Sequence, residues 1–493
     1  MSGGDNVRQP PAFASDAQAT AVADALRAAG YTQEGLAELV GFAGLAPPAD
    51  RLADFRERAA APTALAVHTR LWWLGDDVPL AAVRQQLPQL EAFARAGLLR
   101  VAGDTVQPQV AIAARQGLCV VADRPAEVHA GAPTDHVMGP AQSTVLVERI
   151  MADAPGGQVL DLGTGSGYLA LRAAASADRV VATDLNARAV AMTRLNAQLN
   201  GIDRVEALAG DLYEPVGQRR FDRIVSSPPY VISPGSDLMF CESGWRGDLF
   251  CRELLRQAAA HLVDGGLCQM VCNWPHGEDQ SWQEGIADWF DDIGCDALVF
   301  GGDSQSADEY ASNWIRDTRA RGDDVMAREH PRWLAYLKRE GIERVSYGAV
   351  TLRRRDATGT CPNWVKYEPA PLQFGEGGGA DIVRRLALFD FLEQASDSEL
   401  LDAVIVVGPG LEMTVPEAPD ANRTLRRAHG LVQEVSVDVN IAGLIERCTG
   451  TAPLRAVLEA IAGDLALPFE RFAPMALATV RGLIAKGVLE PAD

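Results

Sequence analysis

Several features that would place a protein in a specialised class are absent from this sequence. No apolar run approaches the length of a membrane span, and the stretch MSGGDNVRQPPAFAS has neither the basic nor the apolar region of a signal peptide. The 45 lysines and arginines are outnumbered by 66 aspartates and glutamates, which gives a formal net charge of −21. Such a balance disfavours non-specific binding to phosphate backbones. We therefore expect a cytoplasmic protein that makes no membrane contact.

Paired cysteines are absent as well. The eight cysteines form no C-x-x-C pair, and a chain of 493 residues does not need disulfides to hold its fold. Cys268 and Cys272 stand in the apolar run GGLCQMVCNW, where even spacing puts both on one face of a strand. We expect buried thiols at these positions rather than metal ligands, and no metal site.

The sequence does contain enough apolar residues for several cores, since 47% of its residues are hydrophobic. Residues 1–115 are mainly helical in pattern, and three helices followed by a hairpin over Gly103-Asp104 predict a winged-helix-like domain. Asp16 is the expected N-cap of the first helix. Residues 382–493 predict a second winged-helix-like domain, after a linker at 373–381. Neither domain carries a basic stripe, which favours a structural or protein-docking role over nucleic-acid binding.

The pattern changes between these domains, where residues 116–372 alternate short apolar runs with helical stretches. The alternation predicts an α/β domain with a doubly wound, mostly parallel sheet of seven strands, the last one added antiparallel. The expected strands are QVLDLG, RVVATDLN, VEALAGDL, FDRIVSS, GLCQMVCNW, CDALVFGG and RVSYGAVTLRRR. The expected helices are 187–200, 247–263 and 280–292, and 303–343 is a polar insert before the last strand.

A glycine-rich turn follows the first of these strands, in VLDLGTGSGYLAL (159–171). The strand ends at Asp161, and a helix is expected to begin near Ser166. Glycines let the backbone approach a ligand closely at the N-terminus of that helix. The second strand ends in Asp184, whose carboxylate can accept both hydroxyls of a ribose. The third ends in AGDLYEP, which contains Asp211.

The fourth strand, FDRIVSS, stops on a Ser-Pro-Pro-Tyr run. Two prolines remove two backbone donors and fix φ near −65°, so the turn is stiff. A Ser227 side chain and a Pro228 carbonyl held in this way are two acceptors that can hold the two N–H groups of an amide or amine. The predicted catalytic residues are Ser227, Pro228, Pro229 and Tyr230.

Together these motifs resemble class I S-adenosylmethionine-dependent methyltransferases. The glycine turn is similar to their first motif, Asp211 to the acidic residue that meets the adenine amino group, and Ser-Pro-Pro-Tyr to the element of enzymes that methylate planar nitrogen. The stretch 159–234 is similar to the small-domain group, which contains release-factor glutamine methyltransferases (the HemK/PrmC type) and guanine-N2 ribosomal RNA methyltransferases. The resemblance implies S-adenosyl-L-methionine as cofactor, with the binding residues Asp161, Gly163, Thr164, Gly165, Gly167, Asp184, Leu185, Asp211, Leu212 and Ser227.

The sequence does not decide which molecule accepts the methyl group. The glutamine and guanine enzymes usually carry Asn where this chain has Ser227, whereas cytosine-N4 enzymes use Ser-Pro-Pro-Tyr. The acidic composition favours a protein glutamine, with a translation factor as a possible partner. An exocyclic amine of RNA or DNA (guanine-N2, adenine-N6 or cytosine-N4) is the alternative, and a basic groove of Arg353, Arg354 and Arg355 beside Tyr230 would favour it. A non-catalytic binding or regulatory protein is the third possibility.

Secondary candidates surround these motifs. The loop 135–144 is expected over the cofactor, and Asn273-Trp274 is a candidate for the substrate side. Three polar residues after Pro-Pro-Tyr, namely Glu242, Arg246 and Asp248, are candidates for a lid. The individual candidates are Gly139, Ser143, Asn273, Trp274, Glu242, Arg246 and Asp248. A nicotinamide enzyme is disfavoured because no catalytic lysine, Tyr-x-x-x-Lys or histidine motif follows the glycine turn.

Overall fold

The computed structural model describes most of the chain, in two compact units. The described residues are 9–42, 44–129, 132–152, 156–235, 245–318, 323–355, 362–416, 418 and 421–492. The first unit consists of residues 1–148, 154–358 and 363–368, and the second of 149–153, 359–362 and 369–493. The predicted boundary at 115/116 falls inside the first unit, so the division into three domains stays a prediction.

An eight-stranded sheet forms the centre of the first unit, with the strand order β13-β11-β12-β10-β9-β6-β7-β8. Strands β6 to β10 are parallel, and β12 lies antiparallel between β10 and β11. This is the predicted doubly wound α/β architecture with its antiparallel strand. The prediction of seven strands is one short, because β13 adds to the edge. The strands are β6 Gln158–Leu162, β7 Arg179–Asp184, β8 Val205–Ala209, β9 Phe221–Ser226, β10 Leu262–His276, β11 Cys295–Ser306, β12 Arg344–Arg354 and β13 Val365–Pro369.

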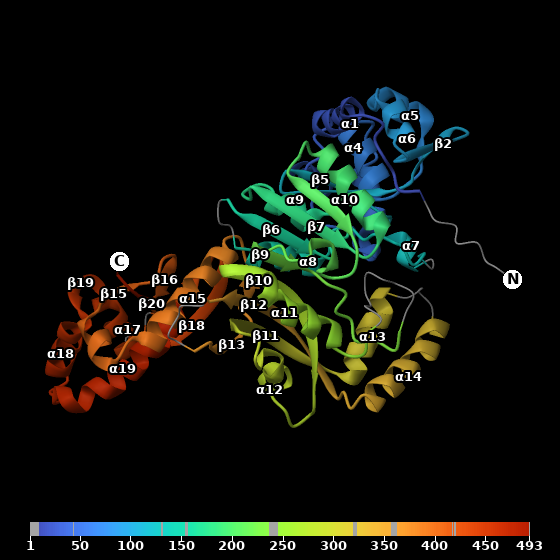
Figure 1. The fold of residues 1–493 in the computed structure, drawn as a ribbon. Helices are drawn as coiled ribbons and strands as arrows, with labels where there is room; N and C mark the ends of the chain where they lie inside the picture. Colours follow the sequence, from blue (N-terminus) through green and yellow to red (C-terminus); the bar gives the residue numbers. More distant parts are fainter. Residues whose placement is uncertain are drawn as a thin grey trace. The chain divides into compact units, whose positions relative to one another are not determined.

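Helices cover both faces of this sheet (Figure 1). Helix α9 (Tyr168–Ala173) packs on β6 and β7, and α10 (Ala187–Leu199) packs on β7 and β8, while α11 (Leu249–His261) and α12 (Trp282–Ile286) join the apolar core of the opposite face. The predicted helices 187–200 and 247–263 are confirmed within two residues. The predicted helix 280–292 is α12 followed by a 3-10 turn, Ala287–Phe290.

The insert before the last strand is folded rather than loop-like. Strand β11 continues to Ser306, and two helices follow, α13 (Ala307–Thr318) and α14 (Asp323–Arg339). These two helices pack against each other at one end of the sheet (Figure 1).

Residues 9–129 complete the main part of the first unit. Helix α4, strand β1, helices α5 and α6, and strands β2 and β3 follow one another in winged-helix order, with a sheet β1-β3-β2 and the predicted hairpin turn at Gly103. The elements are α1 Asp16–Ala28, α2 Gln33–Val40, a 3-10 turn Ala49–Arg51, α3 Leu52–Arg58, α4 Ala64–His68, a π-helical turn Thr69–Trp73, β1 Val78–Pro79, α5 Leu80–Gln86, α6 Leu90–Arg95, β2 Leu99–Ala102, β3 Thr105–Pro108, β4 Ala111–Arg115, β5 Leu118–Ala122, α7 Ala126–His129 and, further on, α8 Gln142–Ile150.

Helix α10 packs on strands β7 and β8 of the sheet and also on the N-terminal region. Its Met192 and Leu195 are buried in the same apolar cluster as Val22, Leu26 and the side chains of the winged-helix-like region. Its polar face bonds the edge of β5: the amide of Asn196 accepts from the N–H of Val121 and donates to its carbonyl, both at 2.8 Å. The helix therefore joins the N-terminal region to the sheet.

The second unit contains the predicted C-terminal domain. Its core is built from apolar residues of α15 to α19 and of the short strands β15, β17, β18 and β20. The elements are β14 Gln373–Phe374, α15 Gly378–Gln394, α16 Asp397–Asp402, β15 Val404–Val407, β16 Leu411–Thr414, β17 Arg423–Arg427, β18 Leu431–Val437, α17 Val439–Arg447, β19 Thr449–Pro453, α18 Leu454–Asp464, α19 Phe469–Ala485 and β20 Leu489–Pro491. The order of α17, β19, α18, α19 and β20 is again winged-helix-like.

Two local predictions are wrong. The stretch 373–381 is not a linker, because Gln373 and Phe374 pair with β18 and α15 begins at Gly378. The N-cap of α1 is Ser15, whose hydroxyl accepts from the N–H of Gln18, so Asp16 is the first residue of the helix. Within the described ranges, no helix is long and apolar enough to cross a membrane.

Candidate active site

The glycine turn lies at the carboxyl end of β6. Gly163 and Gly165 have φ values of 72° and 56°, in the left-handed region that favours glycine. The N–H groups of Gly163 and Thr164 donate to the carbonyl of Thr183 at 2.8 and 2.9 Å, which ties the turn to β7. A Cβ atom at Gly163 or Gly165 would meet no protein atom within 4 Å. The turn therefore presents bare backbone to open space, and α9 begins after it at Tyr168 rather than near Ser166.

Asp161 lies beneath this turn, with only 1% of its surface exposed. One carboxylate oxygen accepts from the hydroxyl of Thr164 at 2.7 Å and from the N–H of Ala170 at 2.9 Å. Among the described residues, none bonds the second oxygen. Burial raises the pKa of Asp161 to about 7, against the lowering effect of these two bonds. Asp161 thus supports the turn from below and does not line the cavity above the turn.

Asp184 faces the turn from the end of β7. Its Oδ2 accepts from the N–H of Gly165 and its Oδ1 from the N–H of Asn186, both at 2.8 Å. Burial raises the pKa of Asp184, and the two backbone bonds oppose that rise. Each oxygen of a carboxylate has two acceptor sites, so Asp184 keeps capacity for two further donors. Leu185, the next residue, is 62% exposed.

The third strand ends in a turn that brings Asp211 and Leu212 to the same place. Gly210 has a φ of 154°, and a Cβ atom there would lie 2.4 Å from Pro215. Leu212 adopts a φ of 43°, which is unusual for a non-glycine residue and typical of strained functional turns. The side chain of Asp211 is exposed.

The Ser-Pro-Pro-Tyr turn follows β9, next to the glycine turn. The hydroxyl of Ser226 donates to the carbonyl of Leu162 at 2.7 Å, which joins the ends of β9 and β6. The hydroxyl of Ser227 donates to the hydroxyl of Ser143, on α8, at 3.1 Å. Because this bond takes the only hydroxyl proton of Ser227, both lone pairs of its oxygen are left to accept.

One cavity of about 680 Å³ contains both turns. It lies where the carboxyl ends of β6 to β9 meet, at the point where the strand order reverses, which is the usual ligand site of such sheets. Neither lysine nor arginine occurs among the described residues of its wall. Of the predicted site residues, all except Asp161 and Gly167 line it: Gly163, Thr164, Gly165, Asp184, Leu185, Asp211, Leu212, Ser227, Pro228, Pro229 and Tyr230.

Gly167 is needed for packing rather than for the wall. Its φ is 87°, and a Cβ atom there would lie 2.8 Å from a methyl carbon of Thr193 on α10. The secondary candidates are divided. Gly139 and Ser143 line the cavity, whereas Trp274 is fully buried in the core and Asn273 bonds the hydroxyl of Tyr310 behind the wall.

Two of the three candidate lid residues, Arg246 and Asp248, do not line the cavity and contact other side chains. The carboxylate of Asp248 accepts from the indole of Trp289 at 2.9 Å, and Arg246 pairs with Glu340. Glu242 lies outside the described residues.

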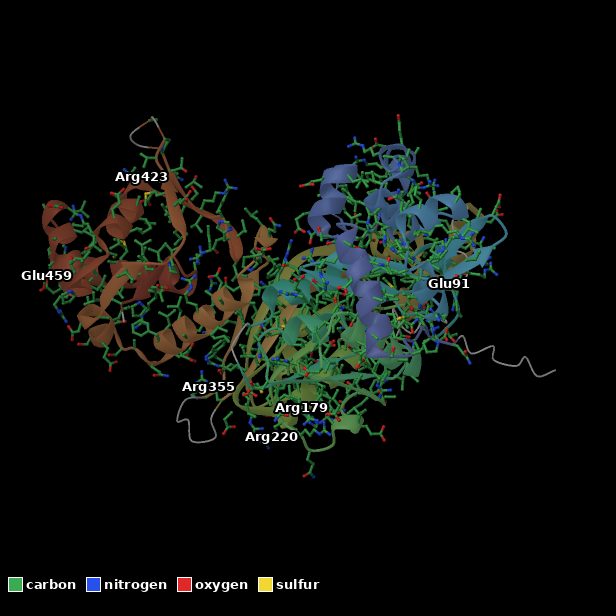
Figure 2. All side chains as sticks on the ribbon, turned by 90° about the horizontal axis from the view of Figure 1, so that it is seen from above. Glu91, Arg179, Arg220, Arg355, Arg423 and Glu459 are labelled. Atoms are coloured by element: carbon green, nitrogen blue, oxygen red, sulfur yellow. The ribbon has the colours of Figure 1, made fainter. Side chains whose placement is uncertain are left out.

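The three consecutive arginines do not form a groove beside Tyr230. Tyr347 of β12, whose ring centroid is 5.6 Å from that of Tyr230, pairs with Asn273, whereas Arg353 pairs with Leu267 at the opposite end of β10. Six residues of strand separate the two positions by about 20 Å. Arg353 and Arg355 bind the buried Asp296, and Arg354 binds Asp264. Figure 2 shows Arg355 at the same edge of the first unit as Arg179 and Arg220, where the parallel strands begin.

Sequence reasoning missed the aromatic residues at one end of the cavity. Trp245, Phe250 and Trp314 line it together with Tyr230. The ring centroids of Tyr230 and Trp314 are 6.0 Å apart, with the planes inclined by 72°. Trp314 comes from the insert helix α13, and no local pattern around it indicates a site.

The comparisons with known proteins agree with this geometry. Residues 140–291 match the family model described as the methyltransferase small domain, and this segment contains strands β6 to β10 of the Rossmann-like sheet. Residues 28–109 match a model described as a domain of unknown function (DUF7059).

Several curated relatives with similar segments are named as glutamine methyltransferases. A release factor glutamine methyltransferase of Bordetella pertussis is 39% identical over 24% of this chain and 49% of the relative. A ribosomal protein uL3 glutamine methyltransferase of Bradyrhizobium diazoefficiens is 34% identical over 29% of this chain and 49% of the relative. The chain thus spans about half the length of the curated relatives it matches. A ribosomal protein L11 methylase of Lactobacillus delbrueckii has a solved structure with 20% identity, covering 45% of this chain and 82% of that one, at a TM-score of 0.26.

Proposed function

We propose that this protein is an S-adenosyl-L-methionine-dependent N-methyltransferase that transfers a methyl group to the side-chain amide of a protein glutamine. The observation that carries the proposal is the single cavity that holds the glycine turn, Asp184 and the Ser-Pro-Pro-Tyr turn together. A site of this composition can hold a nucleoside-containing ligand and a planar nitrogen next to each other.

The residues of the first half of the cavity fit the cofactor. The bare backbone of Gly163 and Gly165 leaves room for a close ligand. The remaining acceptor capacity of Asp184 suits the two hydroxyls of a ribose. Leu185 and Leu212 offer apolar contact to a flat base, beside the carboxylate of Asp211. Bound there, the cofactor would supply an electrophilic methyl group on a sulfonium centre.

The residues of the second half can hold the acceptor nitrogen. Ser227 has both lone pairs available, and the carbonyl of Pro228 is fixed by the two-proline turn. Two acceptors directed at the two N–H groups of an amide hold its nitrogen in place and favour pyramidalisation toward the methyl group. A strong general base is not required, because the proton can leave after the cationic amine has formed.

A protein glutamine is favoured over a nucleobase by charge. Nucleic-acid enzymes hold the phosphates around their target with cationic side chains, and the described part of the cavity wall has none. The arginines 353–355 are engaged with carboxylates at the far end of the sheet. Both curated relatives described above carry glutamine methyltransferase in their names.

The proposal is tested by incubating the full chain with methyl-labelled cofactor and a cell extract, then digesting separate samples with protease and nuclease. Label that survives nuclease and is lost to protease supports a protein acceptor, and hydrolysis should release labelled methylamine from a methylated glutamine amide. Label that survives protease and is lost to nuclease would replace the proposal with amine methylation of RNA or DNA. Cofactor binding without any transfer would indicate a non-catalytic binding or regulatory protein.

A further inference from the structure

The insert helices α13 and α14 pack on the chain that follows the Ser-Pro-Pro-Tyr turn. Ile232 is fully buried in an apolar cluster whose other buried members come from the insert and the adjoining start of β12. They include Tyr310, Ile315, Trp333 and Leu337. The insert is therefore the support of the acceptor turn and not an independent appendage.

Directed hydrogen bonds reinforce this packing on both sides of the loop. The hydroxyl of Tyr310 accepts from the N–H of Ile232 at 2.9 Å, and the guanidinium of Arg332 donates to the carbonyl of Gly235 at 2.9 Å. Beyond the residues that are not described, the N–H of Gly247 donates to the hydroxyl of Tyr336 at 3.0 Å. The loop is thus held by α13 at its start and by α14 at both of its ends.

Among the described residues of the insert, Trp314 is the one that reaches the cavity. Its ring meets Tyr230 nearly at right angles, and Tyr310 packs on it from behind, with ring centroids 6.2 Å apart and planes inclined by 63°. Tyr347 packs on Tyr230 from another direction. The rings of Tyr230 and Trp314 are partly exposed, and they form a corner of two aromatic faces on the same cavity as Ser227.

We propose that Trp314 is a specificity-determining residue that contacts the methyl acceptor, and that α13 is the acceptor-recognition element of this protein. The inference rests on the proposed methyl transfer. One face of the corner packs on the plane of the amide, and the other packs on the methylene stem of the same side chain. The described wall of the cavity holds no lysine or arginine, so an aromatic corner there accepts a neutral amide and penalises a carboxylate, which would lose its hydration.

The experiment compares the full-length wild type with Trp314→Ala, Trp314→Phe and, as the matched control, Asn313→Ala. Asn313 neighbours Trp314 on α13 but directs its amide to Gln305, away from the cavity. Methyl transfer is measured against increasing concentrations of nuclease-treated extract protein, and cofactor affinity is measured by calorimetry. N-acetylglutamine methylamide and N-acetylglutamate methylamide are compared as competitors.

We expect Trp314→Ala to raise the apparent KM for extract protein by about tenfold to a hundredfold, as for a buried aromatic contact, with cofactor affinity within twofold. Trp314→Phe should recover part of the loss, and Asn313→Ala should behave as wild type. The glutamine compound should compete better than the glutamate compound.

An unchanged KM in Trp314→Ala overturns the inference and leaves the proposed function intact. A parallel loss of cofactor affinity also overturns it, because Trp314 would then act on the folding of the site. Cofactor binding by the wild type without transfer to any protein overturns the proposed function and the inference together.

Discussion

The two halves of the cavity are built in different ways. The cofactor half comes mainly from one continuous stretch, in which three successive parallel strands each end in a turn that reaches the cavity, at Gly163, Asp184 and Asp211, and the loop 134–144 adds to the wall. The acceptor half is assembled from Ser227 to Tyr230, from α11 and from the distant insert helix α13. The difference indicates that the first half is set by the architecture of the sheet, whereas the second also depends on how an insert, distant in the sequence, packs on the sheet.

The largest effect is expected in the cofactor half, from Asp184→Ala. The variant removes both the ribose acceptor and the side chain that holds the N–H groups of Gly165 and Asn186. Hydrogen bonds to a charged group contribute about 1.5–3 kcal/mol each, so cofactor affinity should fall about a hundredfold or more. Calorimetric titration measures the loss. Asp211→Ala, on an exposed side chain, should lose less, and an Asp184→Ala protein with wild-type affinity would contradict the role assigned here.

The next effect separates the halves. Ser227→Ala should reduce the rate of methyl transfer by about a hundredfold, the usual cost of removing one positioned hydrogen-bonding group, and leave cofactor affinity within threefold. Ser143→Ala should give a smaller loss, because Ser227 keeps its oxygen and loses only the partner that orients its proton. Single-turnover kinetics and calorimetry measure the two quantities. An equal loss of rate and of cofactor affinity in Ser227→Ala would remove the functional distinction between the halves.

A pH effect on stability is expected from the support of the glycine turn. Because burial raises the pKa of Asp161 to about 7, the folded protein retains a proton that the unfolded chain releases near pH 4. The stabilisation is complete below pH 4 and is lost as the pH rises toward 7. Denaturation at pH 5 and pH 8 should therefore show a falling stability in the wild type and a flatter profile in Asp161→Asn. Equal profiles would show that Asp161 does not carry that proton.

The smallest effect tests whether the acceptor half is packed as firmly as its contacts indicate. Cys251 and Cys272 are buried behind it, and burial raises the pKa of both thiols well above the ordinary value. Thiolates are the reactive form, so iodoacetamide should leave both unlabelled in the native protein. Peptide mapping by mass spectrometry distinguishes them from the other cysteines. Labelling of Cys272 at neutral pH would show that the wall opens.

The sequence indicated which strand-end turns reach the first half of the cavity, because the signals of these turns are local. Each acidic residue lies within two residues of the carboxyl end of a strand, and parallel strands bring their carboxyl ends to one edge. The exact function of Asp161 and Gly167 was not predictable, because support of the turn and contact with a ligand require the same residue types at the same positions. Gly167, for example, is required by Thr193, which follows it by 26 positions in the chain.

The acceptor half was predictable only at the Ser-Pro-Pro-Tyr turn. Trp314 lies in a helix whose other residues are mostly polar, and its position depends on how the insert packs on Ile232. The arginines 353–355 did not correctly indicate a basic groove beside Tyr230, for the same reason. Their charge is visible in the sequence, but the antiparallel direction of β12 carries them to the opposite end of the sheet. Long-range register of this kind has no local signature.

The double role of α10 has a consequence for work on this protein. The segment that matches the methyltransferase family model begins at residue 140, after β5 and the winged-helix-like region. Excised at that point, it would leave Met192 and Leu195 facing water and Asn196 without the backbone of Val121. The same asparagine donates to the carbonyl of Ser166 in the glycine turn, at 2.8 Å. We therefore expect that this segment does not fold on its own, and that a shortened protein loses solubility and cofactor affinity together.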